Sequence, residues 1–112
     1  ESVPYMMGWF EVCANIPNVN FWAPTRMWVV PEFRAAFQHK PANLSLRPSA
    51  LFYGVNAPAV QFMSAGSTSA PHDIDGHKTC PAYRSGVLES CEGVGCRTCW
   101  TAPETPVNYS TH

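Results

Sequence analysis

Four cysteines in the last third of the chain are the residues best suited to chemistry. They follow the spacing C-x10-C-x4-C-x2-C and are Cys80, Cys91, Cys96 and Cys99. Thiolate is the soft ligand that both Zn²⁺ and iron–sulfur clusters select. Two glycines between Cys91 and Cys96 allow the loop to turn its backbone N–H groups toward sulfur. The spacing therefore predicts that these four cysteines hold one ion or cluster.

Three interpretations of this spacing compete. A structural zinc site usually shows two C-x2-C pairs, and this chain has one. The segment from Cys91 to Cys99 has the three-cysteine spacing of plant-type ferredoxins, but the fourth cysteine, Cys80, lies upstream. Disulfides suit secreted proteins, and here the cysteine number is odd and no signal-peptide pattern is present. We expect an iron–sulfur cluster of the [4Fe–4S] type, with Zn²⁺ as the alternative and disulfides or free thiols as the third reading.

Other residues carry weaker signals. Cys13 lies on the apolar face of a predicted helix, where an unpaired cysteine is usually a small buried hydrophobe. The segment 72–77 has a histidine at each end and two aspartates between them, which indicates either a second metal site or a polar loop. Arg26 and Arg47 follow or end predicted strands, where parallel sheets bind ligands, so they either contact an anion or reach solvent.

The elements that must position these residues lie mostly ahead of the cysteines. Ser2 is a predicted cap for a helix that ends near Asn15, and Pro31 opens a second helix that runs to about residue 39. Strands are predicted at 19–25 and 44–48, and alternation at 59–64 predicts a third. Because the first two strands are separated by a helical crossover, they should be parallel. The fold class is α/β: a small helix–strand–helix–strand core followed by a cysteine-rich, loop-dominated region.

Composition limits the function classes. The 112 residues fit one domain, with an α/β core at 1–63 and a cysteine-rich metal-binding region at 64–112. Net charge is −1 with no Lys/Arg cluster, which argues against nucleic-acid binding, and four tryptophans are better read as core. The apolar runs are far shorter than the roughly 20 residues of a membrane helix. We therefore expect no membrane or nucleic-acid partner and a cytoplasmic location.

Charged residues make up 13% of the chain, against about 25% in typical domains. The large apolar side chains concentrate in residues 1–63. This predicts an exposed apolar patch on that side of the molecule, covered by a second copy, by a partner, or by a part of a longer protein. Trp100, directly after Cys99, is expected to shield the metal site from water.

Several segments together resemble a known family. In order along the chain they are Phe21-Trp22-Ala23-Pro24-Thr25-Arg26, Leu46-Arg47-Pro48-Ser49-Ala50, Thr79-Cys80-Pro81-Ala82, Cys96-Arg97-Thr98-Cys99-Trp100 and Val107-Asn108-Tyr109-Ser110-Thr111-His112. The series resembles the carboxyl-terminal half of the gene product 88 family of phage and plasmid proteins, and the similarity spans nearly the whole chain. The resemblance implies a phage-type protein whose physiological role is unknown.

Longer members of that family carry a further cysteine-rich segment that looks like the start of a radical-SAM-type barrel. The resemblance therefore leaves three functions open. One is a small iron–sulfur protein with a redox partner, possible because four cysteine ligands suit electron transfer. The second is a zinc-stapled interaction module with a protein partner. The third is a fragment of a barrel enzyme, although these 112 residues hold no C-x3-C-x2-C motif for S-adenosylmethionine chemistry.

Overall fold

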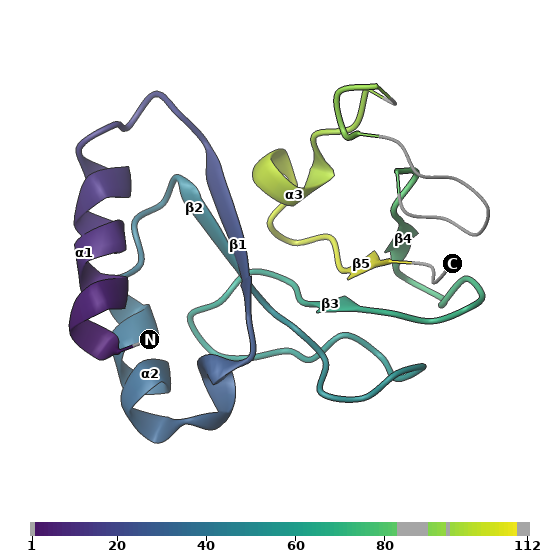
Figure 1. The fold of residues 1–112 in the computed structure, drawn as a ribbon, viewed down its shortest axis with the longest axis horizontal. Coiled ribbons are helices and arrows are strands. Elements are labelled where there is room, and N and C mark those ends of the chain that lie inside the picture. Colours follow the sequence, from purple (N-terminus) through teal and green to yellow (C-terminus); the bar gives the residue numbers. More distant parts are fainter. Residues whose placement is uncertain (1, 83–89, 94, 110–112) are drawn as a thin grey trace.

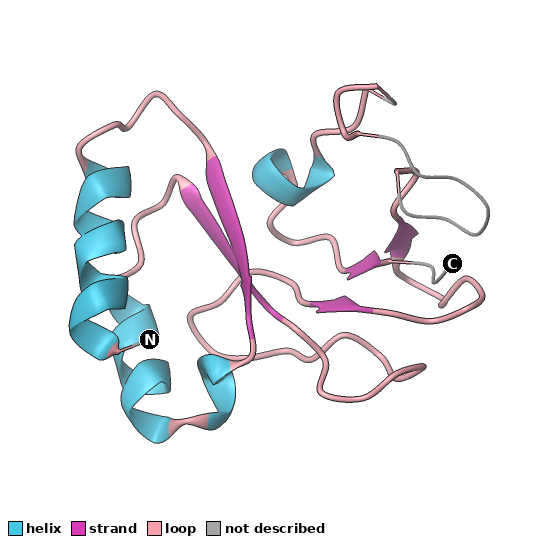
Figure 2. Ribbon diagram, in the orientation of Figure 1, coloured by secondary structure: helices cyan, strands magenta, loops and turns pink. Residues whose placement is uncertain are grey.

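The computed structural model describes residues 2–82, 90–93 and 95–109. Helices and parallel strands form a mixed α/β globule (Figures 1 and 2). The elements are α1 (Val3–Ala14), β1 (Phe21–Thr25), α2 (Pro31–Ala36), β2 (Leu44–Pro48), β3 (Ser67–Thr68), β4 (Lys78–Thr79), α3 (Thr98–Thr101) and β5 (Val107–Asn108), with 3-10 turns at Met27–Val29 and Phe37–His39. This confirms the expected fold class.

Helix α1 begins and ends where its sequence predicts. The Ser2 hydroxyl accepts a hydrogen bond from the Tyr5 N–H at 3.3 Å, and Pro4 occupies the first turn, where a missing N–H costs nothing. Asn15 is the C-cap. The side chain of Asn43 then ties the end of α1 to the next loop, since its Nδ2 donates to three backbone carbonyls: Cys13 at 2.9 Å, Ile16 at 3.1 Å and Val19 at 2.8 Å.

Strands β1 and β2 are parallel, in the register Phe21↔Leu44 to Thr25↔Pro48. Side chains alternate between the two faces of this pair, as strand geometry requires. One face packs on α1 and α2 and forms the main hydrophobic core, whose buried members are Phe10, Cys13, Phe33, Phe37, Leu44 and Leu46. The other face carries Trp22, Ser45 and Arg47 and is turned toward α3 (Figure 1).

A second set of strands continues the parallel arrangement. Strands β3, β5 and β4 pair in that order, all parallel, and the bridge Ser49↔Ser67 connects the chain after β2 with β3. Each of these three strands is only two residues long. Regular hydrogen bonding therefore contributes little to holding the carboxyl-terminal region together.

The predicted strand at 59–64 is wrong. These residues form a turn closed by Met63 N–H to Val60 C=O at 3.2 Å, and Phe62 adopts a φ of 68°. The only backbone bond that links the segment to β2 is Ser64 N–H to Leu46 C=O at 3.0 Å. The alternation arose because Met63 reaches the core while Phe62 stays 49% exposed. A single inward side chain in a turn mimics the period of a strand.

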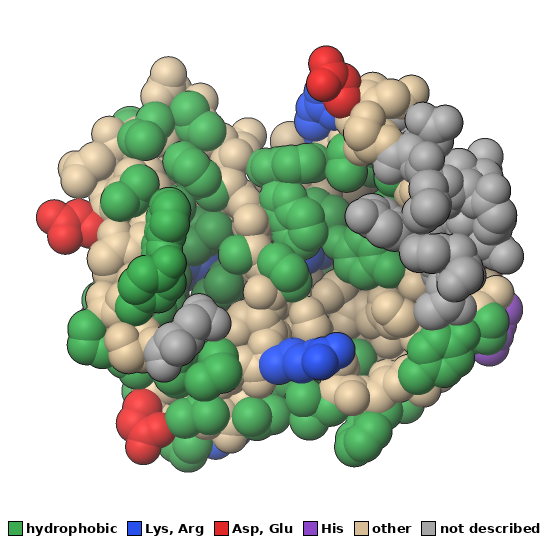
Figure 3. Space-filling view, viewed as in Figure 1, with side chains coloured by type: hydrophobic (Ala, Val, Ile, Leu, Met, Phe, Trp, Pro, Cys, Tyr) green, Lys and Arg blue, Asp and Glu red, His purple; other side chains and the backbone are tan. Residues whose placement is uncertain are grey.

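The expected exposure of apolar side chains in the amino-terminal part is confirmed. Among described residues, the large hydrophobic side chains that remain exposed all lie between Tyr5 and Phe62, and Phe52 is the most exposed at 73%. Hydrophobic groups cover much of the face seen in Figure 3, and its Asp and Glu side chains lie at the periphery. What covers this surface stays a prediction. No helix in the described part of the chain has the length and apolar character to cross a membrane.

Candidate metal centre

Two of the four candidate cysteines lie in a second, smaller hydrophobic cluster. Cys80 directly follows β4 and Cys99 lies in α3, and their side chains are 5% and 7% exposed. The backbone N–H of Cys80 donates to the Asn108 carbonyl at 2.8 Å, which extends the pairing of β4 with β5 by one residue. The cluster is completed by Ala82 and Val107, with Trp22, Trp100 and Tyr109 packed around it.

The other two cysteines occupy the turn that leads into α3. Cys91 and Cys96 are both partly exposed, and the Cys96 N–H donates to the Cys91 carbonyl at 2.9 Å. Gly95 within this turn has a φ of 68°, a conformation that glycine adopts without strain. The spacing of the glycine and the two cysteines thus closes a tight loop beside the buried pair.

Three of the sulfurs influence one another. Burial raises the pKa of Cys99, and the charges of Cys80 and Cys91 raise it further. The Tyr109 hydroxyl, which lies 3.2 Å from the Cys99 Sγ, and the charge of Arg47 act in the opposite direction and lower this pKa. Burial and the nearby Cys99 raise the pKa of Tyr109 in turn, so this phenol stays protonated and available as a donor. The charges of Cys80 and Cys91 thus act on the Cys99 thiol.

Cys96 has different neighbours. Its Sγ lies 3.5 Å from Thr98 Oγ1, which accepts a hydrogen bond from Lys78 Nζ at 2.8 Å. Partial burial raises the pKa of Cys96, but the hydrogen bonds from Thr98 and the charge of Lys78 outweigh this and hold the pKa below its usual value. Within the described ranges, no three His, Cys, Asp or Glu side chains are assembled closely enough to hold one metal ion.

A buried arginine lies directly behind the cysteines. Arg47 on β2 is 0% exposed. Its guanidinium donates only to backbone carbonyls, namely Cys99 at 3.4 Å, Ala65 at 2.9 Å, Thr105 at 2.7 Å, Thr98 at 3.1 Å and Ala102 at 2.7 Å. The expectation that Arg47 reaches solvent or contacts a ligand is wrong, because every N–H direction is used inside the protein.

The charge of Arg47 has no carboxylate at ion-pair distance among described residues. Burial lowers the pKa of Arg47, and Cys99, Tyr109 and Glu104 act in the opposite direction. Alternation in β2 held the signal for this placement: Leu44 and Leu46 share one face, so Arg47 must lie on the other with Ser45. The sequence prediction assumed that the end of β2 is accessible to solvent or ligand, and it missed that α3 packs over this end.

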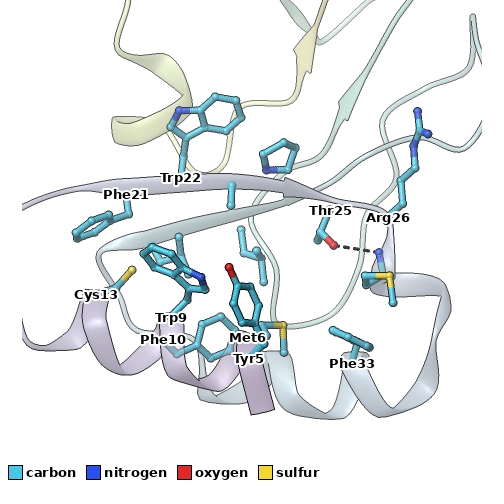
Figure 4. A pocket seen from close by; sticks show the side chains of 15 residues that line it. Tyr5, Met6, Trp9, Phe10, Cys13, Phe21, Trp22, Thr25, Arg26 and Phe33 are labelled. Carbon is cyan, nitrogen blue, oxygen red and sulfur yellow. Dashed lines mark hydrogen bonds between the residues drawn. The ribbon is translucent and has the colours of Figure 1, made fainter. Parts of the chain in front are cut away.

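The two tryptophans beside the centre pack edge to face. The rings of Trp22 and Trp100 are 5.8 Å apart at 80°. Ser45 Oγ donates to the Trp100 carbonyl at 3.4 Å and holds α3 against the sheet. On the opposite side of β1, a groove of about 480 Å³ separates the strand from Tyr5 and Trp9 of α1 (Figure 4).

The remaining candidates have structural surroundings. Cys13 is 3% exposed in the main core, and burial raises its pKa, as expected for a buried hydrophobe. His77 Nε2 accepts a hydrogen bond from the Ala57 N–H at 3.0 Å, and its Nδ1 lies 3.1 Å from the Asp75 carbonyl. This imidazole fixes a loop. All five cysteines lie in the described ranges, and each is a free thiol.

Comparison with known proteins gives one match. The sequence model of the family described as gene product 88 matches residues 1–51, which include β1, α2 and β2. The match does not reach the cysteine segment, on which the resemblance seen in the sequence relied most. Neither a curated protein nor a solved structure matches the chain. The similarity to gene product 88 is thus established for the helix–strand–helix–strand part.

Proposed function

We propose that this protein binds one iron–sulfur cluster through Cys80, Cys91, Cys96 and Cys99 and serves in electron transfer. We also infer that the chain corresponds to the carboxyl-terminal half of the gene product 88 proteins, a phage-type family. The segments Thr79–Ala82, Cys96–Trp100 and 107–112 support that inference beyond the 51 residues of the family match.

The observation that carries the proposal is the buried cation behind the cysteines. Arg47 is fully buried, and only carbonyl dipoles neutralise it among described residues. A buried charge without an ionic partner is costly, by several kcal/mol on the order-of-magnitude scale for buried ions. Four thiolates around a Zn²⁺ ion or a [4Fe–4S] cluster carry a net negative charge. Such a centre beside Cys99 supplies the missing counter-charge.

The sparse secondary structure gives a second argument. Strands β3, β4 and β5 have two residues each and α3 has four, so loops make up most of the described residues between 64 and 109. A metal centre contributes folding free energy because the unfolded chain holds no preformed site. Ligands drawn from the end of β4, the following turn and α3 would connect the segments that lack regular hydrogen bonding.

The chain's own residues suit a redox centre. An iron–sulfur cluster with four cysteine ligands leaves no iron open for substrate and supplies one-electron transfer. The Tyr109 hydroxyl lies 3.2 Å from the Cys99 sulfur and would donate to a metal-bound thiolate there, and hydrogen bonds to sulfur are one means by which proteins raise a cluster's reduction potential. Trp22 and Trp100 cover the apolar side of the cysteine cluster and limit the access of water.

Cys96 is one of the ligands that would have to change their contacts, since no three of the candidate side chains in the described chain lie close enough to hold one ion. Its pKa is held below its usual value, which favours the thiolate that a metal ligand must be. Its present partners, Thr98 and Lys78, lie at the protein surface, where a side-chain rotation costs little. Zn²⁺ needs the same four thiolates, and the ferredoxin-like spacing from Cys91 to Cys99 favours iron over zinc.

The test is metal analysis of protein purified without oxygen. We expect iron and acid-labile sulfide in the protein, with broad absorbance near about 400 nm that dithionite bleaches. Cys99→Ser should abolish the absorbance, whereas Cys13→Ala, which also removes a buried cysteine but lies outside the site, should retain it. A colourless protein with one equivalent of zinc would contradict the iron–sulfur proposal, and a folded protein without metal would contradict any metal centre.

A further inference from the structure

A second hollow lies at the carboxyl ends of the parallel strands. It has a volume of about 500 Å³ and is formed by residues that follow β1 and β2, by β3 with the residue after it, and by Tyr109 after β5. Small-molecule sites typically have volumes of about 300–1,000 Å³. In open parallel sheets, ligands bind in the crevice at the carboxyl ends of the strands. The position and size of this hollow therefore match those of a ligand site.

One wall of the hollow carries a free cation. Arg26 directly follows β1, and its guanidinium makes no hydrogen bond or ion pair with the part of the chain that the structure describes. In Figure 4 the Arg26 side chain extends to the side of β1 opposite to Tyr5 and Trp9, although Arg26 also belongs to the lining of the groove along α1. Among the described residues, no Asp or Glu lines the hollow. Within that part of the chain, the guanidinium is thus available to an anion.

Hydroxyl groups from neighbouring strands face the same space. Ser49 Oγ and Ser67 Oγ lie 3.3 Å apart, across the bridge between the chain after β2 and β3, and Ser69 extends the row. The Trp28 indole N–H donates to the Ser49 carbonyl at 2.9 Å and fixes this corner. Hydroxyls at a strand edge can donate to the oxygens of an anion that Arg26 holds in bidentate fashion.

The outer wall is aromatic, and Phe52 is the more exposed of its two rings. Phe52 and Tyr53 are 73% and 58% exposed, and both line the hollow. Large apolar side chains exposed beside a concave polar site gain free energy when a flat ring covers them, at about 25 cal/mol per Å² of buried apolar surface. A ring against Phe52 would bring its acidic substituent toward Arg26.

We propose that this hollow binds an aromatic or conjugated small molecule that carries a carboxylate or phosphate group. Arg26 holds the anion, one hydroxyl of the hydrogen-bonded Ser49–Ser67 pair donates to it, and Phe52 covers the ring. The proposal does not depend on the metal centre. The two sites are adjacent, however, because Tyr109 lines the hollow and its hydroxyl contacts the Cys99 sulfur.

The test is calorimetric titration of the full chain with four probes: phenyl phosphate, benzoate, inorganic phosphate and benzyl alcohol. We expect saturable binding of the first two, and at least tenfold weaker binding of the last two, each of which lacks either the ring or the charge. Arg26→Gln should weaken phenyl phosphate and benzoate at least tenfold, since tenfold equals about 1.4 kcal/mol. Arg34→Gln, which removes an exposed charge from α2, should leave both affinities unchanged.

Two outcomes would overturn the proposal. One is the absence of saturable binding of both acids at about 10 mM, the range in which weak fragment binding is still measurable. The other is binding that Arg26→Gln and Phe52→Ala leave unchanged, because the acids would then bind elsewhere. Repeating the titration on metal-free protein separates this proposal from the proposed function, since binding at Arg26 needs no metal.

Discussion

Replacing Arg47 with methionine removes the buried guanidinium while keeping most of the length of the apolar stem. Of the five carbonyls that Arg47 contacts, Thr98 and Ala102 also accept backbone N–H groups, those of Ala102 and Thr105. The carbonyls of Cys99, Ala65 and Thr105 have Arg47 as their partner and accept no other hydrogen bond in the described chain. The substitution therefore leaves three acceptors without a donor there, one of them buried and two partly buried.

Each unsatisfied buried polar group costs about 1–3 kcal/mol. Three such groups cost about 3–9 kcal/mol, and the relief from removing a buried charge without an ionic partner offsets part of this, which leaves an expected net loss of about 3 kcal/mol in the free energy of unfolding. A domain of this size loses about 10–20 °C in melting temperature for 3 kcal/mol. Arg47→Lys keeps the charge but has fewer hydrogen-bond donors, so the free energy of unfolding of this variant should lie between those of the unchanged protein and of Arg47→Met.

The assay is urea unfolding followed by circular dichroism and by tryptophan fluorescence, on protein with its natural metal content. Arg34→Met is the matched control, because Arg34 is exposed on α2 and should change stability by less than about 0.5 kcal/mol. If Arg47→Met fails to fold, Arg47→Lys supplies the measurable difference. The reasoning is refuted if Arg47→Met and Arg34→Met unfold at the same urea concentration.

Three further predictions concern other residues. Gly66→Ala should destabilise the fold by about 2 kcal/mol or more, because the added Cβ would lie 2.5 and 2.6 Å from two backbone carbonyl oxygens. In Gly8→Ala, within α1, the added Cβ meets nothing within 4 Å, so this substitution should stabilise the fold by about 0.5–1 kcal/mol. Thermal melts compare the two variants. In metal-free protein, the rate at which iodoacetamide modifies Cys96 should rise with pH at a midpoint below that of an ordinary thiol, since the pKa of Cys96 is lowered. Lys78→Met should move that midpoint upward, and an unmoved midpoint contradicts the role of Lys78. Asn43→Ala should lower stability by about 1–2 kcal/mol in the same urea assay, since it removes the donor for three carbonyls at the end of α1, and a change within error would show that water replaces it.

Local signals made the amino-terminal elements predictable. Ser2 and Asn15 mark the ends of α1 through hydrogen bonds that span at most four residues. Pro4 and Pro31 lie in the first turns of α1 and α2, where their fixed φ suits the helix and no N–H is needed. The parallel pairing of β1 with β2 followed from chain length alone, because a helical crossover fits between them. These features depend on contacts that are close in sequence, and the structure confirms them.

The carboxyl-terminal region was less predictable because its contacts are distant in sequence. Arg47 meets carbonyls 18 to 58 residues away, and no local pattern encodes such partners. Strands β3, β4 and β5 are too short to show a period, and the turn at Phe62 imitated one. The cysteine spacing identified the residues of the candidate site, but their surroundings, with Tyr109 on one sulfur and Lys78 near another, required the fold.

The alternation of β2 links the core, the buried cation and the proposed centre in one argument. Leu44 and Leu46 must face α1 and α2 to form the core, so Arg47 is forced onto the side where α3 brings Cys99. A cation there is destabilising beside neutral thiols and stabilising beside metal-bound thiolates. Because this coupling is reciprocal, the free energy by which the metal centre stabilises Arg47 equals that by which Arg47 tightens metal binding. Loss of Arg47 should therefore cost more stability in metal-loaded protein than in metal-free protein.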